Sequence, residues 1–81
     1  MTVRVRLFAA ARQVAAAEQI DLALAEGATI ADLRRALLAE CPALAELLPH
    51  AAFAVDENYA NDATLLTAAS DVACIPPVSG G

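Results

Sequence analysis

The stretch TIADLRRALLAECP, residues 29–42, predicts a helix around which the rest of the domain is organised. Thr29 begins the helix as a cap, and Asp32 three residues later completes the pattern of a capping box. Pro42 ends the helix, because proline lacks the N–H group that a helix would need there. A helix that is apolar on one side has to pack on another element. Its apolar stripe consists of Ile30, Leu33, Leu37 and Cys41.

Segments of alternating character on both sides of this helix predict the sheet that it covers. In TVRVRLFA, residues 2–9, and QIDLALA, residues 19–25, apolar side chains occupy every second position. AFAV, residues 52–55, and DVACI, residues 71–75, alternate in the same way. A period of two is typical of strands with one buried face. The inward-facing residues predicted from this pattern are Val3, Val5, Leu7, Ile20, Leu22, Leu24, Phe53, Val55, Val72 and Cys74.

The connecting segments have weaker patterns. Residues 9–17 are rich in alanine and predict a short helix or an irregular connector. Residues 43–48 predict one further helical turn, stopped by Pro49. The acids and asparagines of residues 56–62 predict a turn, and we expect a further strand before the final one.

This order of elements favours an α+β fold in which a mixed sheet packs on one main helix. A hairpin, a helix crossing one face and a last strand beside the first would make the first and last strands parallel and central. That arrangement is the ubiquitin-like β-grasp. Because 81 residues have room for one core, we expect a single domain over residues 1–75 and an extended, flexible C-terminal tail over residues 76–81.

The composition argues against several classes of function. The net charge is −5 and all five basic residues are arginines, so no basic stripe is present for nucleic acid or an anionic membrane. Arg4, Arg6 and Arg12 interrupt the apolar N-terminal run, and we therefore expect neither a membrane span nor a signal peptide. Without a secretion signal, Cys41 and Cys74 are expected to be reduced thiols of a cytoplasmic protein.

No combination of side chains predicts an enzyme active site or a metal site. Cys41 and Cys74 lie on faces that should point inward, where thiols are structural and inert. His50 is the only histidine and is expected at the surface. These three residues lack the paired spacing of a zinc site, and the acids of residues 56–62 lack the spacing and the glycine of a calcium loop. We therefore expect the domain itself to bind no metal and no cofactor.

The last seven residues, IPPVSGG, contain two of the three glycines. Pro76 and Pro77 cannot donate hydrogen bonds to a sheet, and they hold the chain extended. The six residues from Pro76 onward could reach about 20 Å. So thin a tail would fit another protein's active site, where the carboxylate of Gly81 could react after activation, for example as an acyl-adenylate made with ATP. An idle or engineered tail is the alternative.

A second feature of the sequence indicates docking to a partner. Phe8 and Ile75 alternate away from the inward-facing residues of the first and last strands. If these strands are neighbours, both side chains lie on one outer face, rimmed by Arg4 and Arg6, beside the root of the tail. An exposed aromatic and aliphatic patch has the composition of a binding surface. A loop that covers this face is the alternative.

Four segments together resemble the small subunit of molybdopterin synthase, the MoaD family. DVACIPPVSGG, residues 71–81, is similar to the family's C-terminal signature, in which the tail reads P-P-V-S-G-G. VRVRLFAAAR resembles its first strand and turn, TIADLRRAL its helix, and AVDENYA its A-V-N-x-x-Y segment. The resemblance covers essentially the whole chain. Among the departures, Cys74 stands where the family often has phenylalanine, and Asp56 replaces the usual asparagine, so a turn bond from that side chain is in doubt.

The resemblance implies a ubiquitin-like sulfur carrier that is a non-catalytic subunit of an enzyme complex. Gly81 would be adenylated by a ubiquitin-activating-like adenylyltransferase that uses ATP and magnesium, and would then become a thiocarboxylate. The large synthase subunit would accept the tail and pass the sulfur to precursor Z, which forms the dithiolene of molybdopterin. The implied assembly is a heterotetramer of two small and two large subunits. The tail residues that would enter the large subunit are Pro76, Pro77, Val78, Ser79 and Gly80, and the implied contact residues are Phe8 and Ile75.

Three alternatives remain open from the sequence. A sulfur carrier for another pathway, such as thiamine, cysteine or tRNA thiolation, would use the same terminal chemistry. A ubiquitin-like protein modifier would also need adenylation, although without lysine it could not form lysine-linked chains of itself. A plain interaction domain would need the outer face and not Gly81.

Overall fold

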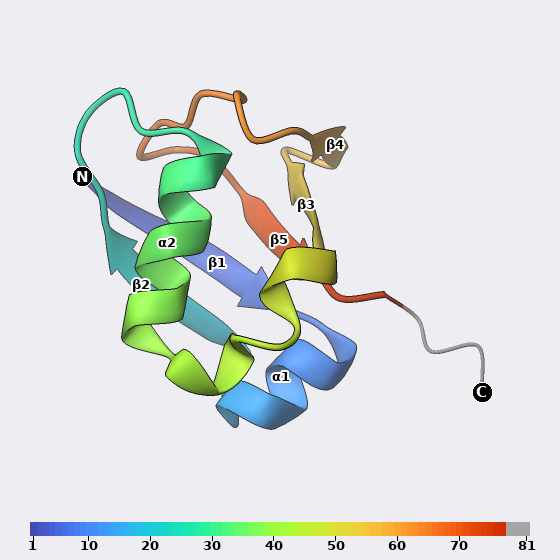
Figure 1. Ribbon diagram of the computed structural model, residues 1–81. Coiled ribbons are helices and arrows are strands. Elements are labelled where there is room, and N and C mark those ends of the chain that lie inside the picture. The colour runs from blue at the N-terminus through green and yellow to red at the C-terminus, as the bar shows by residue number, and fades with distance from the viewer. Residues whose placement is uncertain (78–81) are drawn as a thin grey trace.

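The computed structural model describes residues 1–77, and these form a five-stranded mixed sheet with helices on one face (Figure 1). The spatial order of the strands is β2-β1-β5-β3-β4. The strands are β1 (Thr2–Leu7), β2 (Gln19–Ala23), β3 (Ala52–Val55), β4 (Asn58–Ala60) and β5 (Val72–Ile75). The helices are α1 (Ala9–Ala15) and α2 (Ile30–Glu40), and two short 3-10 helices follow, η1 (Pro42–Leu44) and η2 (Leu48–His50).

The parallel pairing of β1 and β5 determines which residues meet at one end of the sheet. Val5, Arg6 and Leu7 are in register with Val72, Ala73 and Cys74, while the other three strand pairs are antiparallel. The predicted central parallel pair is therefore confirmed. Because the two strands run in the same direction, the residues that follow them emerge at the same end of the sheet. Phe8 and the C-terminal segment are neighbours for this reason.

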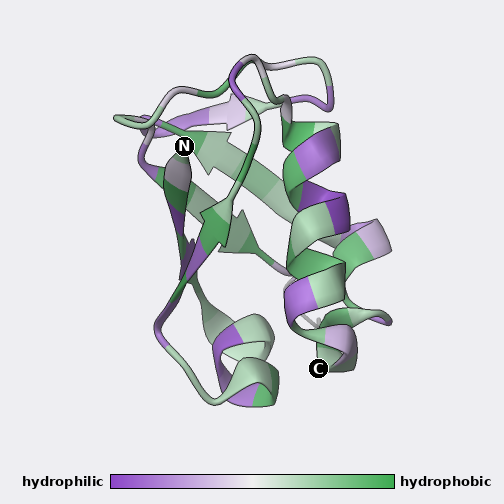
Figure 2. Cartoon of the chain, turned by 90° about the vertical axis from the view of Figure 1, so that its left-hand side faces the viewer, coloured by the Kyte–Doolittle hydropathy of each residue, from purple (hydrophilic) through white to green (hydrophobic). Residues whose placement is uncertain are grey.

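The core lies between the sheet and α2, as the alternating pattern predicts. Val3 and Val5 of β1 are fully buried, and so are Ile30, Leu33 and Leu37 of α2. Figure 2 views the two layers from the side and shows hydrophobic and hydrophilic residues alternating along the strands and the helix. Cys41, the last member of the predicted stripe, is only half-buried because it lies at the helix end. Ile20 and Val55 are likewise half-buried.

The capping box predicted at the start of α2 is present. The hydroxyl of Thr29 accepts a hydrogen bond from the backbone N–H of Asp32, and the carboxylate of Asp32 accepts one from the backbone N–H of Thr29 at 2.9 Å. The backbone N–H and the hydroxyl of Thr29 both donate to the carboxylate of Asp32, and they lower its pKa below the ordinary value because they stabilise the ionised form. Asp32 also pairs with Arg35 one turn further along the helix. The helix ends at Glu40, before Pro42.

Of two connectors, one agrees with the prediction and one differs from it. Residues 9–15 form the regular helix α1, which was one of the two possibilities. Where one helical turn stopped by Pro49 was expected, the chain instead makes the two 3-10 helices η1 and η2, and Pro49 lies inside the second. Proline fits there because the first N–H groups of a helix have no partner within it.

The segment predicted as one turn over residues 56–62 is interrupted by a strand. Asp56 and Glu57 form a first turn, with φ values of 51° and 70°, and β4 follows immediately at Asn58–Ala60. A second turn begins at Asn61, whose carbonyl accepts from the N–H of Thr64 at 3.0 Å. Two consecutive residues with positive φ are the pattern of a two-residue hairpin turn, which usually contains asparagine or glycine. Aspartate and glutamate in these positions gave no such signal, so the sequence did not separate turn from strand.

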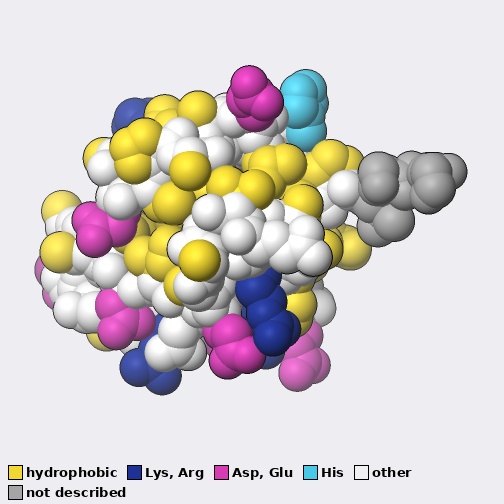
Figure 3. Space-filling view, turned by 90° about the horizontal axis from the view of Figure 1, so that it is seen from below, with side chains coloured by type: hydrophobic (Ala, Val, Ile, Leu, Met, Phe, Trp, Pro, Cys, Tyr) yellow, Lys and Arg dark blue, Asp and Glu magenta, His cyan; other side chains and the backbone are white. Residues whose placement is uncertain are grey.

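Several apolar side chains remain exposed after the core has formed. Figure 3 shows the end of the molecule that lies below in Figure 1, where hydrophobic side chains gather in the middle and charged ones stand mostly at the margin. Within residues 1–77, no helix combines the length and the hydrophobicity that a membrane crossing requires. The large hydrophobic residues that are exposed are Phe8, Val14, Leu38, Tyr59 and Leu65.

Candidate functional site

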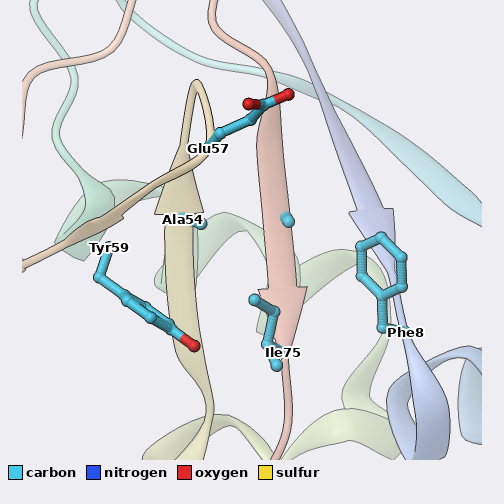
Figure 4. Close-up of a pocket in the computed structure, with 6 residues that line it drawn as sticks. Phe8, Ala54, Glu57, Tyr59 and Ile75 are labelled. Carbon is cyan, nitrogen blue, oxygen red and sulfur yellow. The ribbon is translucent and has the colours of Figure 1, made fainter.

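The outer face of the sheet, opposite α2, carries an apolar groove with a volume of about 410 Å³ (Figure 4). It crosses β3, β5 and the end of β1, next to the point where β5 leads into the C-terminal segment. We call it the docking groove. Its lining consists of Phe8, Ala54, Glu57, Tyr59, Ala73 and Ile75.

The docking groove has a flat floor and aromatic walls. Ala54 and Ala73 are directly paired across β3 and β5, and both line the docking groove with no side chain larger than a methyl group. Tyr59 stands at one side and Phe8 at the other, while Glu57 and Ile75 lie at opposite ends (Figure 4). Tyr59 is 80% exposed and Phe8 40% exposed, although both are large aromatic side chains. Exposed aromatic residues around a small-residue floor are typical of a surface that buries a partner's side chains.

Phe8 is held at the docking groove by its backbone. β1 ends at Leu7, and Phe8 is extended, with φ −124°, as it caps α1. Its N–H donates to the carbonyl of Cys74 at 3.3 Å, which fixes it beside β5, and its own carbonyl accepts from Ala11 at 3.1 Å. The predicted shared face of Phe8 and Ile75 is therefore present, and no loop of residues 1–77 fills the groove between them.

The two arginines predicted at the rim occupy different places. Arg6 lies over the ring of Phe8, with 5.5 Å between its guanidinium carbon and the ring centre, and forms a bidentate pair with Asp71 at 2.9 and 3.0 Å. Arg4 pairs with Asp21 of β2 at 3.2 Å and does not line the docking groove. Arg6 is thus part of the rim, whereas Arg4 lies towards the β2 side of the sheet.

Four lining residues were missed from the sequence. Tyr59 lies on β4, a strand that was taken for part of a turn, and Glu57 belongs to the hairpin turn itself. Ala54 and Ala73 are outward-facing alanines, which carry no hydrophobic signal in a chain with 22 alanines. An exposed tyrosine two residues beyond a tight turn was the one signal that could have indicated this wall.

The doubt about the turn bond of Asp56 is removed by the structure. Its carboxylate accepts a hydrogen bond from the N–H of Asp71 at 3.0 Å, and its own N–H donates to the carbonyl of Asp71 at 2.9 Å. Aspartate therefore makes the side-chain-to-backbone bond that was in question. These bonds tie the β3–β4 turn to the start of β5 and so hold Glu57 at its end of the docking groove.

The C-terminal segment is described only as far as Pro77. Pro76 is buried against the domain, and Pro77 is exposed. The first proline therefore packs on the domain, whereas the second lies at the surface. The remaining predicted tail residues lie outside the described residues, and they are Val78, Ser79, Gly80 and Gly81.

The thiols and the histidine lie apart from the docking groove's lining. Cys74 is fully buried, and this burial raises its pKa to about 11, an effect that the cation of Arg34 opposes in part. Cys41 is half-buried and His50 is exposed, as Figure 3 shows for the histidine in cyan. In residues 1–77 no three side chains of the metal-ligating types come together.

A mixed sheet that packs on one main helix, with its first and last strands parallel and adjacent, is the ubiquitin-like β-grasp. The structure is similar to that of SAMP1, a small archaeal modifier protein of Haloferax volcanii, with a TM-score of 0.87, 28% identity and 100% of both chains covered. It is also similar to a chain in the complex of subunits 1 and 2 of molybdopterin-converting factor from Helicobacter pylori 26695, with a TM-score of 0.71, 29% identity and 100% coverage of both chains.

The sequence comparisons narrow this class to one family. The chain is 35% identical to the molybdopterin synthase sulfur carrier subunit of Chlamydomonas reinhardtii. The alignment is 83 positions long and covers 100% of both proteins. The sequence profile of the ThiS family matches residues 5–81. The chain belongs to the ThiS family, and its resemblance to the small subunit of molybdopterin synthase is confirmed.

Proposed function

We propose that this protein is the sulfur carrier subunit of molybdopterin synthase. The observation that carries the proposal is the position of the docking groove, which ends at Ile75 and so adjoins the segment that leads to Gly81. A partner seated in the docking groove would be beside the root of the tail. The similarity to the Chlamydomonas reinhardtii carrier over the full length of both chains supports the same function.

The chemistry belongs to the carboxylate of Gly81. An oxygen of this carboxylate attacks the α-phosphate of ATP in a separate adenylyltransferase, which holds the magnesium ion, and pyrophosphate leaves. A sulfide-level sulfur nucleophile then displaces AMP, and the terminus becomes a thiocarboxylate. Transfer of this sulfur to precursor Z, with water supplying the replacing oxygen, restores the carboxylate. Because a dithiolene contains two sulfurs, two carriers are consumed for each product.

The role of the body is to be recognised by two partners in turn. The adenylyltransferase and the large synthase subunit both need access to the tail, and the docking groove is the apolar surface at its root. The Helicobacter pylori complex supports a large-subunit partner, since there a similar chain is bound to subunit 2. The assembly proposed for this chain contains two small and two large subunits. It would operate in the cytoplasm, where ATP and reduced thiols are available.

The test is the intact mass of the protein after expression with its adenylyltransferase. Exchange of one oxygen for sulfur at Gly81 is the expected result, followed by loss of that sulfur when the large subunit and precursor Z are added. A matched control is the same chain without Gly81, which should show neither change. If the mass never shifts, and the chain without Gly81 still supports molybdopterin synthesis, the proposal is wrong.

A ubiquitin-like modifier is the second candidate, because the structure is similar to that of a small archaeal modifier protein over its full length. Both functions begin with adenylation, so that step does not distinguish them. Covalent adducts of this chain on lysines of other proteins would favour the modifier. A free thiocarboxylate that is consumed only with precursor Z would favour the carrier.

A further inference from the structure

The docking groove is electrostatically asymmetric. Glu57 is the only charged residue that lines it, and the carboxylate is exposed. Within residues 1–77 this carboxylate forms no ion pair and accepts no hydrogen bond. The remaining lining is alanine, isoleucine and aromatic residues, so one end of an apolar surface carries a single unbalanced negative charge.

The neighbouring charges do not balance Glu57. Arg6, the cation nearest to the docking groove's rim, is already held by both oxygens of Asp71 and by the face of Phe8. The carboxylate of Asp56, the other turn residue, is occupied by the N–H of Asp71. Arg6 uses Nε and Nη2 for the bidentate pair with Asp71, and among residues 1–77 it forms no ion pair with Glu57. An incoming cation would therefore find Glu57 available.

The shape of the docking groove selects the kind of cation. From Glu57 the floor runs over Ala54 and Ala73, with the ring of Tyr59 at the side (Figure 4). An arginine side chain matches this sequence of surfaces, because its aliphatic stem packs on apolar and aromatic groups while its planar guanidinium pairs with a carboxylate.

We propose that the docking groove receives an arginine side chain from the docking partner, with its stem over Ala54 and Ala73, beside the ring of Tyr59, and its guanidinium paired with Glu57. Glu57 then sets the orientation of docking, because the partner's cation lies at the end of the docking groove opposite to Ile75 and the tail. Only the identity of that partner as the large synthase subunit rests on the proposed function. A carboxylate at this rim contributes chiefly to specificity and to the rate of association.

The first experiment needs no partner protein. The isotope-labelled chain is titrated in an NMR experiment with N-acetyl-arginine methylamide, and separately with the norleucine analogue, which has an apolar side chain only. We expect saturable shifts at the amides of Ala54, Glu57, Tyr59 and Ala73 with the arginine probe. Glu57→Gln should weaken this probe about threefold, as for an exposed ion pair, and should leave the norleucine probe unchanged.

The control variant is Glu46→Gln, which removes the same charge from an exposed position outside the docking groove. It should bind the arginine probe like the wild-type chain. Absence of saturable shifts at the docking groove, or equal weakening by Glu46→Gln and Glu57→Gln, overturns the proposal.

The second experiment measures the affinity of the large synthase subunit for the same variants. Glu57→Arg should weaken binding at least tenfold, and Glu57→Gln should reduce its dependence on salt, while Glu46→Gln changes neither. If the large subunit binds all three alike, the arginine proposal fails and the proposed function stands. If the large subunit does not bind the wild-type chain but the probe result holds, the proposed function fails and the arginine site remains.

Discussion

At the scale of single residues, the backbone bends through left-handed conformations without glycine. Ala9, Ala16, Asp56 and Glu57 all have positive φ, and Gly27 is the only glycine among residues 1–77. A left-handed conformation costs a residue with a Cβ roughly 1 kcal/mol relative to glycine. The two acids of the hairpin turn thus retain side chains at a cost in stability, and both side chains are used, one for the bond to Asp71 and the other at the docking groove.

Ala16 offers a direct measure of this cost. It ends α1 with φ 54° and lies outside the docking groove, and glycine is the favoured residue at such a helix end. Ala16→Gly should raise the free energy of unfolding by about 0.5–1 kcal/mol. Urea denaturation measures the change. As a control, Ala10→Gly places glycine inside the same helix and should lower the free energy of unfolding by a similar amount; a loss of stability in Ala16→Gly would contradict the prediction.

A substitution at Phe8 should affect partner binding much more than it affects the stability of the fold. Because its side chain is 40% exposed and its backbone makes the structural contacts, Phe8→Asp should change the free energy of unfolding little. Binding of the large synthase subunit should fall by about 2 kcal/mol or more, as for a central aromatic contact residue. Calorimetric titration and urea denaturation together give both numbers. Val14→Asp is the control, since Val14 is equally exposed but lies on α1 outside the docking groove; unfolding of Phe8→Asp would show that the ring belongs to the core.

Cys74 should make the folded state sensitive to alkaline pH. Burial raises the pKa of its thiol from 9.0 to about 11, so the folded state favours the protonated form. The resulting contribution to stability is complete below about pH 9 and is lost as the pH rises towards 11. Urea denaturation across this range should show a decline that is absent in Cys74→Ala. That variant will be less stable at every pH, so the comparison concerns the slope; equal slopes would contradict the prediction.

The residues whose positions could be predicted from the sequence are those that belong to an alternating pattern along a strand. Val3, Val5 and Leu7 could be assigned to the core because three members repeat at a period of two. Phe8 and Ile75 could be placed on one outer face from the same alternation. Ala54 and Ala73 could not be found, because the property that matters is the absence of side-chain volume between two aromatic walls, which depends on strand register.

At the scale of elements, α2 was predictable because its signals are local. The capping box, the apolar stripe and Pro42 lie within 14 consecutive residues, and each acts on its own neighbours. β4 was not predictable in the same way. It has three residues, follows a turn without glycine, and is recognised only by its pairing with β3. A further strand was expected, but Tyr59 was assigned to the preceding turn, and the wall of the docking groove that Tyr59 forms was missed for this reason.

The capping box gives a prediction for the helix. Thr29→Ala removes the hydroxyl that accepts from Asp32, and should lower the free energy of unfolding by about 1 kcal/mol. Thr29→Ser keeps the hydroxyl and should lose much less. The same hydroxyl donates to the carboxylate of Asp32 and helps to lower its pKa, whereas the bond from the Thr29 N–H remains in Thr29→Ala. The contribution of the hydroxyl bond is present above the ordinary value of 3.8 and is lost as the pH falls below it. Denaturation at neutral pH and again in this acidic range should therefore show a smaller difference between Thr29→Ala and wild type under acid; a difference that is unchanged in acid would contradict this.

At the scale of the whole molecule, the residues that stabilise the β-grasp differ from the residue to which we assign the chemistry. Every residue of the buried core found in the structure lies between Val3 and Cys74. The parallel pairing of β1 and β5 brings Phe8 beside Ile75, so the docking groove and the start of the C-terminal segment lie at one end of the sheet. Pro76 is buried at that point and fixes the origin of the tail, while the proposed chemistry is confined to the carboxylate of Gly81.

This separation predicts two reciprocal variants. A chain that lacks Gly81 should unfold at the same urea concentration as the wild-type chain, because the core residues and the docking groove are unchanged. It should still bind the large synthase subunit, with an affinity within about tenfold of wild type, since the apolar contacts of the docking groove carry most of the binding energy. It should transfer no sulfur. Phe8→Asp should behave in the opposite way, with an intact Gly81 and little binding. Measuring unfolding, binding and sulfur transfer for both variants tests this arrangement, which is wrong if loss of Gly81 alone abolishes binding or destabilises the fold.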